Sequence, residues 1–323
     1  MKRSTKIWLL SAIVFILVGI IGSFVILNSA DWDLNQLSTQ KIQRKSYAIT
    51  EKFNSIYLET DIANVCFTYS TDGQIKVDCY ENEKATHKVN VKDGVLTIKL
   101  NDTRTWYEKI SIVPTKTPTV TVYLPYSSLS SLTVKATTSD VAVYNCSNFE
   151  NIDIKVNTGY VFCSAPASKL TQISTTTGDI DVKKVRGESM KLSTSTGDIS
   201  IKNVSCTNDI TANTDTGDIT LDTVSCSSFL STANTGDLEM NSVIASSWFS
   251  IKRSTGDVAF NRCNAFDISI ETDTGDVTGS LLYSKEFKVK SNTGKVSVPK
   301  FNGFGKCNIT TDTGDIIIEV TGY

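Results

Sequence analysis

The sequence is poor in the residues that carry most enzyme and metal chemistry. It has a single histidine, His87, in 323 residues, so a Ser-His-Asp or Cys-His arrangement or a histidine zinc site would depend on that one imidazole. No Cys-x-x-Cys motif occurs among the eight cysteines, which argues against a structural metal cluster. We interpret His87 as an ordinary strand or loop residue, and the sequence predicts no catalytic residue, no cofactor and no enzymatic activity.

The chain also lacks a large net charge and is nearly free of proline. Its 32 Lys and Arg residues nearly balance its 34 Asp and Glu residues, and no block of like charge stands out. Because nucleic-acid-binding proteins usually carry a basic tract or patch, we expect no nucleic-acid partner. Abundant serine and threonine with only five prolines favour an ordered β protein with polar outer faces over a disordered chain.

One long hydrophobic run lies near the N-terminus. Residues 7–27 include no charged residue, and a helix of this length spans roughly 30 Å, the thickness of a hydrocarbon core. Basic residues precede the run and aspartates follow it, so the positive-inside rule predicts a cytoplasmic stub at 1–6 and a solenoid outside the cytoplasm. We therefore predict a single-pass anchor in the lipid bilayer, followed by a polar linker at 28–46.

The alternative for this run is a cleaved secretory signal. The run is longer than the usual apolar region of such a signal, and the sequence after it is a poor cleavage site, so a retained anchor is favoured. Both interpretations place the remaining residues across the membrane.

An internal repeat dominates the second half of the chain. Thr-Gly recurs at spacings of 19 or 20 residues, and aspartate follows seven of the nine glycines, the exceptions being Tyr160 and Lys295. Apolar residues fall seven and five positions before the glycine and two and four positions after it in most copies, the exceptions being Thr171, Ser231 and Gly279. The glycines are Gly159, Gly178, Gly197, Gly217, Gly236, Gly256, Gly275, Gly294 and Gly314.

This phase predicts two strands per repeat, joined at a corner by the glycine. Because like residues recur at the same phase, the strands of successive repeats should stack in parallel register, as in a solenoid. We predict an all-β, single-stranded β-helix of about ten coils at 132–323, preceded by one transmembrane helix. The glycine should take a positive φ, the threonine hydroxyl should bond along the ladder, and the aspartate should accept a backbone N–H at the turn.

Both ends of the predicted solenoid need a cover. Residues 47–131 alternate as strands but out of phase, and we interpret them as diverged coils or as a β cap. The chain finishes on the apolar strand Ile316–Val320, with no helix after it. We therefore predict an exposed parallel edge there, through which copies of the chain could oligomerise.

The aspartate row is the main candidate site. Stacked at about 4.8 Å, these carboxylates would repel one another unless a cation such as calcium offset their charge. In the alternative, each aspartate caps its own turn and the row faces water. The candidates are Asp179, Asp198, Asp218, Asp237, Asp257 and Asp276.

Cysteine and tryptophan supply two further candidates. Most cysteines lie at inward phases and are predicted to be core residues, and Cys206–Cys226 is the one pair whose stacking would suit a disulfide. Trp248 occupies a phase that is polar in other repeats, so it should point outward. It could stack on a sugar or be incidental.

The Thr-Gly-Asp coils, the alternating strands before them and the strand end at Leu124-Pro125 resemble a bacterial β-strand-repeat family whose members are labelled "putative adhesin". The resemblance covers roughly residues 47–323. It implies a β-helix-like fold on an anchored or exported protein, in some members linked with envelope stress. It implies no catalytic residues.

Three functional hypotheses follow. The first is a non-enzymatic, adhesin-like surface protein that binds a wall polymer, a glycan or a protein through its solenoid faces. The second is a carbohydrate-active enzyme, for which only scattered candidates exist: Glu239, Glu271, Lys252 and Arg253. The third is a membrane-anchored scaffold or sensor that acts with a partner helix.

Overall fold

The computed structural model describes residues 3–29, 32, 42–106, 117–300 and 303–321. Helix α1 (Arg3–Ser29) contains the hydrophobic run, and its stretch Thr5–Ser29 has a mean hydropathy of 2.9. It is the one helix in these ranges that is long and apolar enough to cross a membrane. Most of the predicted 28–46 linker lies outside the described residues, and its last part is strand rather than linker, because β1 begins at Ile42.

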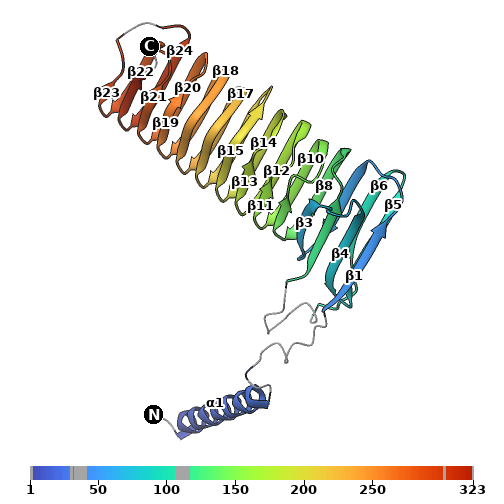
Figure 1. The fold of residues 1–323 in the computed structure, drawn as a ribbon. Helices are drawn as coiled ribbons and strands as arrows, with labels where there is room; N and C mark the ends of the chain where they lie inside the picture. Colours follow the sequence, from blue (N-terminus) through green and yellow to red (C-terminus); the bar gives the residue numbers. More distant parts are fainter. Residues whose placement is uncertain (1–2, 30–31, 33–41, 107–116, 301–302, 322–323) are drawn as a thin grey trace.

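The other described elements are strands (Figure 1). Those before the repeats are β1 (Ile42–Ile49), β2 (Ser55–Thr60), β3 (Asn64–Tyr69), β4 (Ile75–Asn82), β5 (Ala85–Lys92), β6 (Val95–Asp102) and β7 (Thr119–Leu124). The first repeats hold β8 (Ser128–Thr138), β9 (Val141–Val143), β10 (Asn148–Thr158), β11 (Val161–Cys163), β12 (Ala167–Thr177), β13 (Ile180–Lys183), β14 (Arg186–Thr196), β15 (Ile199–Cys206) and β16 (Ile210–Thr216). The last hold β17 (Ile219–Thr235), β18 (Leu238–Thr255), β19 (Val258–Cys263), β20 (Asp267–Thr274), β21 (Val277–Leu281), β22 (Glu286–Thr293), β23 (Val296–Ser297), β24 (Lys306–Thr313) and β25 (Ile316–Val320).

The repeats form a parallel β-solenoid of about nine turns, which confirms the predicted fold. Each coil lies on its neighbour in register, so that Ile199 pairs with Ile219 and Ile219 with Leu238. These inward side chains are at most 1% exposed. The core is therefore a set of apolar ladders, and each coil buries its side chains only between the two coils beside it.

The corner glycines are held in a conformation that other residues resist. All nine have φ between +131° and +155°. A Cβ on Gly217 would lie 2.1 Å from the carbonyl oxygen of Gly197, the corner glycine of the preceding coil. The repeat therefore keeps glycine for two reasons: the positive φ, and a backbone approach that leaves no room for a side chain.

The inward hydroxyl ladder comes from a different threonine than the one predicted. The threonine directly before each corner glycine is exposed. The residue three positions before the glycine points inward instead. Thr175 and Thr194 both donate to the carbonyl oxygen of Gly178, at 2.9 and 3.1 Å. The two threonine hydroxyls therefore act as hydrogen-bond donors to the carbonyl oxygen at the corner.

Arg253 replaces this threonine in one coil and is the largest fully buried side chain, at 1% exposed. Its Nη2 donates to Ser231 Oγ at 2.9 Å, while Nε and Nη1 have no hydrogen-bond partner among the described residues. Desolvation lowers the pKa of the guanidinium to about 10, although Asp218 and Asp237 partly offset this effect. Arg253 is thus a buried, incompletely paired cation.

At the N-terminal end the parallel ladder is stopped by antiparallel strands (Figure 1). The coil of β2 and β3 lies between the coil of β8 and β9 and an outer coil of β6 and β7. Strand β5 then pairs antiparallel with β6, while β4 pairs antiparallel with β7 and with β1. We call β1, β4 and β5 the antiparallel cap.

At the C-terminal end two coils are exchanged relative to their order in the sequence. The last coil of the chain, β24 and β25, lies between the coil of β20 and β21 and that of β22 and β23. The prediction that Ile316–Val320 forms the exposed edge is therefore wrong: the outermost coil is Glu286–Ser297. We call this arrangement the coil exchange.

The exchange has a simple physical reason. Ile316 and Ile318 on β25 are at most 3% exposed, and Ile316 pairs with Val277 on one side and Val296 on the other. The outer strand β22 instead presents Lys288 and Lys290 to solvent, a composition that disfavours pairing with another chain. The most apolar strand is covered and a charged one takes the edge, which weakens the case for oligomerisation there.

We predict that Gly217→Ala will destabilise the chain by about 3 kcal/mol or more, because the methyl group adds a backbone clash to the strain of a positive φ. Thermal unfolding of the detergent-solubilised chain, followed by circular dichroism, measures the effect. Gly73→Ala is the matched control. Gly73 also has a positive φ, but a Cβ there meets nothing within 4 Å, so the cost should be only about 1 kcal/mol. Equal losses in both variants would contradict the close-approach argument.

Arg253→Met should raise the free energy of unfolding by about 1–3 kcal/mol, because it keeps much of the side-chain volume and removes a buried, poorly paired charge. Denaturant titration measures the difference. Lys252→Met, on the same strand but exposed, should leave stability within about 0.5 kcal/mol. A loss of stability in Arg253→Met would mean that the guanidinium has a stabilising partner.

Candidate functional site

An apolar hollow of the solenoid surface lies near its C-terminal end. We call it the aromatic groove and define it by Ile244, Phe266, Tyr283 and Phe304, which are 38, 57, 58 and 89% exposed. Its volume is about 530 Å³, and it is open rather than enclosed. Its polar lining includes hydroxyl, amide and ammonium groups, contributed by Ser246, Asn264, Ser284 and Lys285.

The repeat and the coil exchange build this groove together. Ile244, Asn264 and Tyr283 each come eight residues after a corner glycine, so three successive coils place them on the same side of the solenoid. The residues just before β24 lie on this side, and the Gly305 carbonyl accepts the Glu286 N–H at 2.9 Å. A Cβ on Gly305 would lie 1.8 Å from the Phe266 carbonyl oxygen, so the returning backbone packs tightly and presents Phe304 to solvent.

Trp248 extends this aromatic surface. It is 39% exposed and pairs with Asp267, which directly follows Phe266 in the chain. It lines a second hollow of about 390 Å³ together with Lys306 and Asn308. Trp248 therefore points outward, as its phase indicated, and has other exposed aromatic side chains nearby.

The aspartate row forms a hydrogen-bonded ladder on the outside of the glycine corner. The Oδ1 atom of each aspartate accepts the backbone N–H of the aspartate in the next coil, not of its own turn. The bonds run from Asp198 to Asp179, Asp218 to Asp198, Asp237 to Asp218, Asp257 to Asp237, Asp276 to Asp257 and Asp315 to Asp276, at 2.7–2.9 Å. Each carboxylate thus has a structural role, and a calcium site there stays a prediction.

The ladder also explains why lysine replaces aspartate at position 295. Lys295 lies on the outermost coil, where its backbone N–H donates to Asp315 Oδ1 at 2.7 Å. No described coil stacks beyond this one. A side chain at position 295 therefore meets no backbone N–H of a further coil, and an acceptor such as aspartate is not needed there. The exception in the sequence therefore marks the spatial end of the solenoid.

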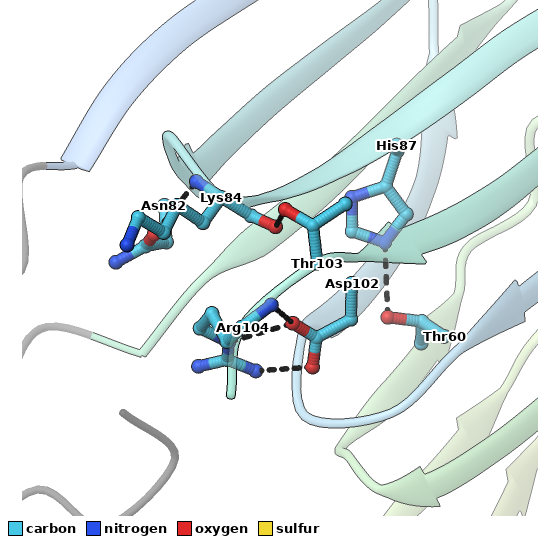
Figure 2. A network of polar contacts seen from close by, with 7 residues as sticks. All are labelled: Thr60, Asn82, Lys84, His87, Asp102, Thr103 and Arg104. Atoms are coloured by element: carbon cyan, nitrogen blue, oxygen red, sulfur yellow. Dashed lines mark hydrogen bonds and ion pairs between the residues drawn. The ribbon is translucent and has the colours of Figure 1, made fainter. Parts of the chain in front are cut away.

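A buried polar cluster in the antiparallel cap surrounds the only histidine (Figure 2). His87 Nε2 lies 3.0 Å from Thr60 Oγ1, and Nδ1 lies 2.9 Å from Glu81 Oε2. The connectivity is that of a hydroxyl–imidazole–carboxylate relay, but the three residues are at most 5% exposed. A substrate would have no path to Thr60 Oγ1 without opening the cap.

Cys79 joins this cluster. A sulfur, a carboxylate oxygen and a ring nitrogen from Cys79, Glu81 and His87 lie within 4.8 Å of one another. The sequence analysis missed the group because it treated His87 in isolation. The available signal was the alternation of Cys79 and Glu81 on one strand, followed by a tight turn that brings His87 back toward them.

The scattered candidates for an enzyme do not converge. Lys252 forms an exposed ion pair of 3.1 Å with Glu271, Arg253 points into the core, and Glu239 is exposed. None of them lines the aromatic groove or the hollow beside Trp248. Cys206 and Cys226 are buried free thiols rather than a disulfide, and burial raises their pKa values to about 11 and 12.

The family model described as Toastrack DUF4097 matches residues 53–242 and 223–322. The chain belongs to the Toastrack DUF4097 family. The Toastrack matches cover the strands from β2 onward and so include part of the antiparallel cap and the coil exchange. No curated protein matches the chain.

This Toastrack chain is also similar to solved structures that share little of its sequence. A "putative adhesin" from Bacteroides fragilis is 16% identical over 88% of this chain and 98% of its own, with a TM-score of 0.41. One from Parabacteroides distasonis is 14% identical over 84 and 98%, with a TM-score of 0.46. A "putative lipid binding protein" from the same species is 13% identical over 74 and 96%, with a TM-score of 0.44. At these scores the likenesses carry no functional argument.

We predict that Asp198→Ala will lower the free energy of unfolding by about 1 kcal/mol, because the Asp218 N–H loses its acceptor. Asp198→Asn should stay within about 0.5 kcal/mol, since its amide oxygen still accepts and one like charge is removed. Asp215→Ala, an exposed aspartate outside the ladder, is the control. Calcium should leave the melting temperature of the wild type unchanged. A calcium-dependent rise that Asp198→Asn abolishes would instead identify the row as an ion site.

Proposed function

We propose that this chain is a non-enzymatic protein of the cell envelope that binds a polysaccharide through its aromatic groove. In this proposal α1 is a retained membrane anchor, its N-terminal end faces the cytoplasm, and the solenoid lies outside. The anchor would hold the groove at the cell surface, where wall polymers and glycans are accessible.

The observation that carries the proposal is the exposure of the groove's rings. A fold that buries its other apolar ladders leaves Phe266, Tyr283 and Phe304 more than half exposed at one place. A contiguous apolar patch with a polar rim marks an interaction site more often than an accident of composition. The faces of sugar rings are apolar while their edges carry hydroxyls, so aromatic rings beside Asn264 and Ser284 suit a sugar chain.

The shape of the groove favours a polymer over a small ligand. The hollow is open, and the neighbouring one beside Trp248 continues the aromatic surface along the coils. An extended chain could contact both, whereas a small molecule would remain largely in water. The mixture of Lys285, Lys306 and Asp267 along these hollows gives no strong charge of one sign, which suits a neutral or weakly charged polysaccharide.

The non-enzymatic part of the proposal rests on the distribution of chemical groups. Acid–base groups need substrate access to act, and the one imidazole is buried in the cap. The groove itself holds one ionisable side chain besides Tyr283, namely Lys285, which is 3% exposed. Binding without turnover is therefore the activity that these residues support.

The test is a binding screen with the full chain in detergent micelles against purified wall polysaccharides and peptidoglycan fragments, followed by analysis for released products. Phe304→Ala combined with Tyr283→Ala should weaken binding by about 10-fold or more, since stacked aromatic anchors dominate such contacts. Tyr69→Ala removes an aromatic of similar exposure at the other end of the solenoid and should change affinity less than about twofold. Retention of no polysaccharide, or equal loss in all variants, would overturn the proposal. Released oligosaccharide would make the chain an enzyme.

A further inference from the structure

We propose that Cys79, Glu81 and His87 form a zinc site that closes the N-terminal end of the solenoid core. The inference is independent of the polysaccharide proposal, because the cluster lies in the antiparallel cap, at the other end of the solenoid from the aromatic groove (Figure 1). Thiolate, carboxylate and imidazole are the three ligand types that zinc prefers in proteins.

The backbone brings the three donors together. Cys79 and Glu81 are two apart on β4, so they share its inward face, and both are buried completely. The chain then turns and returns on β5, which carries His87 toward them. The donor atoms lie within 4.8 Å of one another, and tetrahedral zinc with bonds of about 2.0–2.3 Å would need them roughly 3–4 Å apart. A small rotation of the side chains would suffice.

The hydrogen bonds around the cluster occupy one oxygen of the Glu81 carboxylate and leave the other available to a cation. The Oε2 atom of Glu81 accepts the backbone N–H of His87 at 2.6 Å and faces Nδ1 at 2.9 Å. The Oε1 atom is buried and receives no hydrogen bond among the described residues, although Lys45 Nζ lies 3.5 Å away. A carboxylate oxygen left without a donor at 0% exposure is costly, and coordination would satisfy it.

Thr60 supplies the outer partner that metal-binding imidazoles usually have. Figure 2 shows its hydroxyl directed at His87 Nε2, at 3.0 Å. Accepting the Nε2 proton would fix the tautomer that leaves Nδ1 free to bind a metal. Thr60 lies on β2, so this contact also ties the cluster to the second coil of the solenoid.

The turn between the two ligand-bearing strands is held from outside. Thr103 donates its N–H and its hydroxyl to the Lys84 carbonyl, both at 2.8 Å, and the Lys84 N–H donates to Asn82 Oδ1 at 2.9 Å (Figure 2). Arg104 makes two bonds of 2.9 Å to the Asp102 carboxylate beside it. These contacts pre-organise the donors, as a metal site requires.

The topology gives the site a structural role. Strands β4 and β5 pair with each other only at Asn82 and Ala85. Away from that pair, β4 lies on the side of the solenoid formed by β7, and β5 lies on the side formed by β6. The cluster lies where the two sides part. An ion there would join strands that have almost no backbone ladder between them.

Binding would release a proton from the thiol. Burial, with smaller effects of Glu81 and Asp78, raises the pKa of the Cys79 thiol to about 12. Zinc would form the S–Zn bond as the S–H proton passes to solvent, leaving a thiolate, a carboxylate and a neutral imidazole around the dication, with a water molecule as the fourth tetrahedral ligand.

Calorimetry and metal analysis of the full chain in detergent, after chelation and dialysis, test the proposal with zinc chloride. We expect one zinc per chain and a raised melting temperature. Cys79→Ser and His87→Gln should each weaken zinc binding about 100-fold or more. Cys307→Ser removes another fully buried thiol, one whose neighbour is Lys285 rather than a carboxylate, and should bind zinc as the wild type does.

Cobalt(II) keeps the test decisive if a cap variant fails to fold. In the wild type, cobalt in this site should show the intense d–d bands of a tetrahedral ion and a thiolate-to-metal charge-transfer band. Absence of zinc binding in the chelated and redialysed wild type, or cobalt spectra without the thiolate band, would refute the site. Loss of binding in Cys307→Ser to the same extent as in Cys79→Ser would also refute it. In that case the cluster is a buried hydrogen-bond network only.

Discussion

The solenoid depends on the contact between each corner glycine and the corner carbonyl of the neighbouring coil, which belongs to a glycine everywhere except at Gly159, where it belongs to Ser139. A carbonyl oxygen about 2 Å from where a Cβ would stand leaves one residue type and one register at every corner. Once that register is set, the apolar ladders, the inward threonine hydroxyls and the outward aspartate ladder all follow at the same phase. The Thr-Gly-Asp motif is thus a packing device, and its regularity is a poor guide to ligand binding.

The phase of the glycines made the coils, their parallel stacking and the inward residues predictable, because each depends on local periodicity. The coil exchange was not predictable, since the coils β22–β23 and β24–β25 carry the same motif at the same phase, and either could stack on the coil of β20 and β21. The one sequence signal is that β22 carries the charged Lys288 whereas β25 carries the apolar Ile318, which favours β22 at the exposed edge. Lys295 was noticed as an exception, but its meaning required the spatial order.

The candidate sites were harder to foresee for the same reason. Trp248 was found by its phase, yet the groove beside it needs Phe304, which stands just before the exchanged strand β24. His87 and Cys79 come together because β4 and β5 diverge to opposite sides, a topology that no periodic pattern encodes. Regular coils leave few places for chemistry, and in this chain the unusual side chains gather at the two irregular ends.

The coil exchange also bears on how the chain reaches its native state. A solenoid whose coils stack in sequence order can add them one by one from its N-terminal end. This one cannot finish in that way, since β22 and β23 stack only on the coil of β24 and β25, which follows them in the sequence. The last two turns of the rod must therefore form together once the residues of β24 and β25 are available, and a chain truncated before Lys306 would leave both its outer coil and its aromatic groove unsupported.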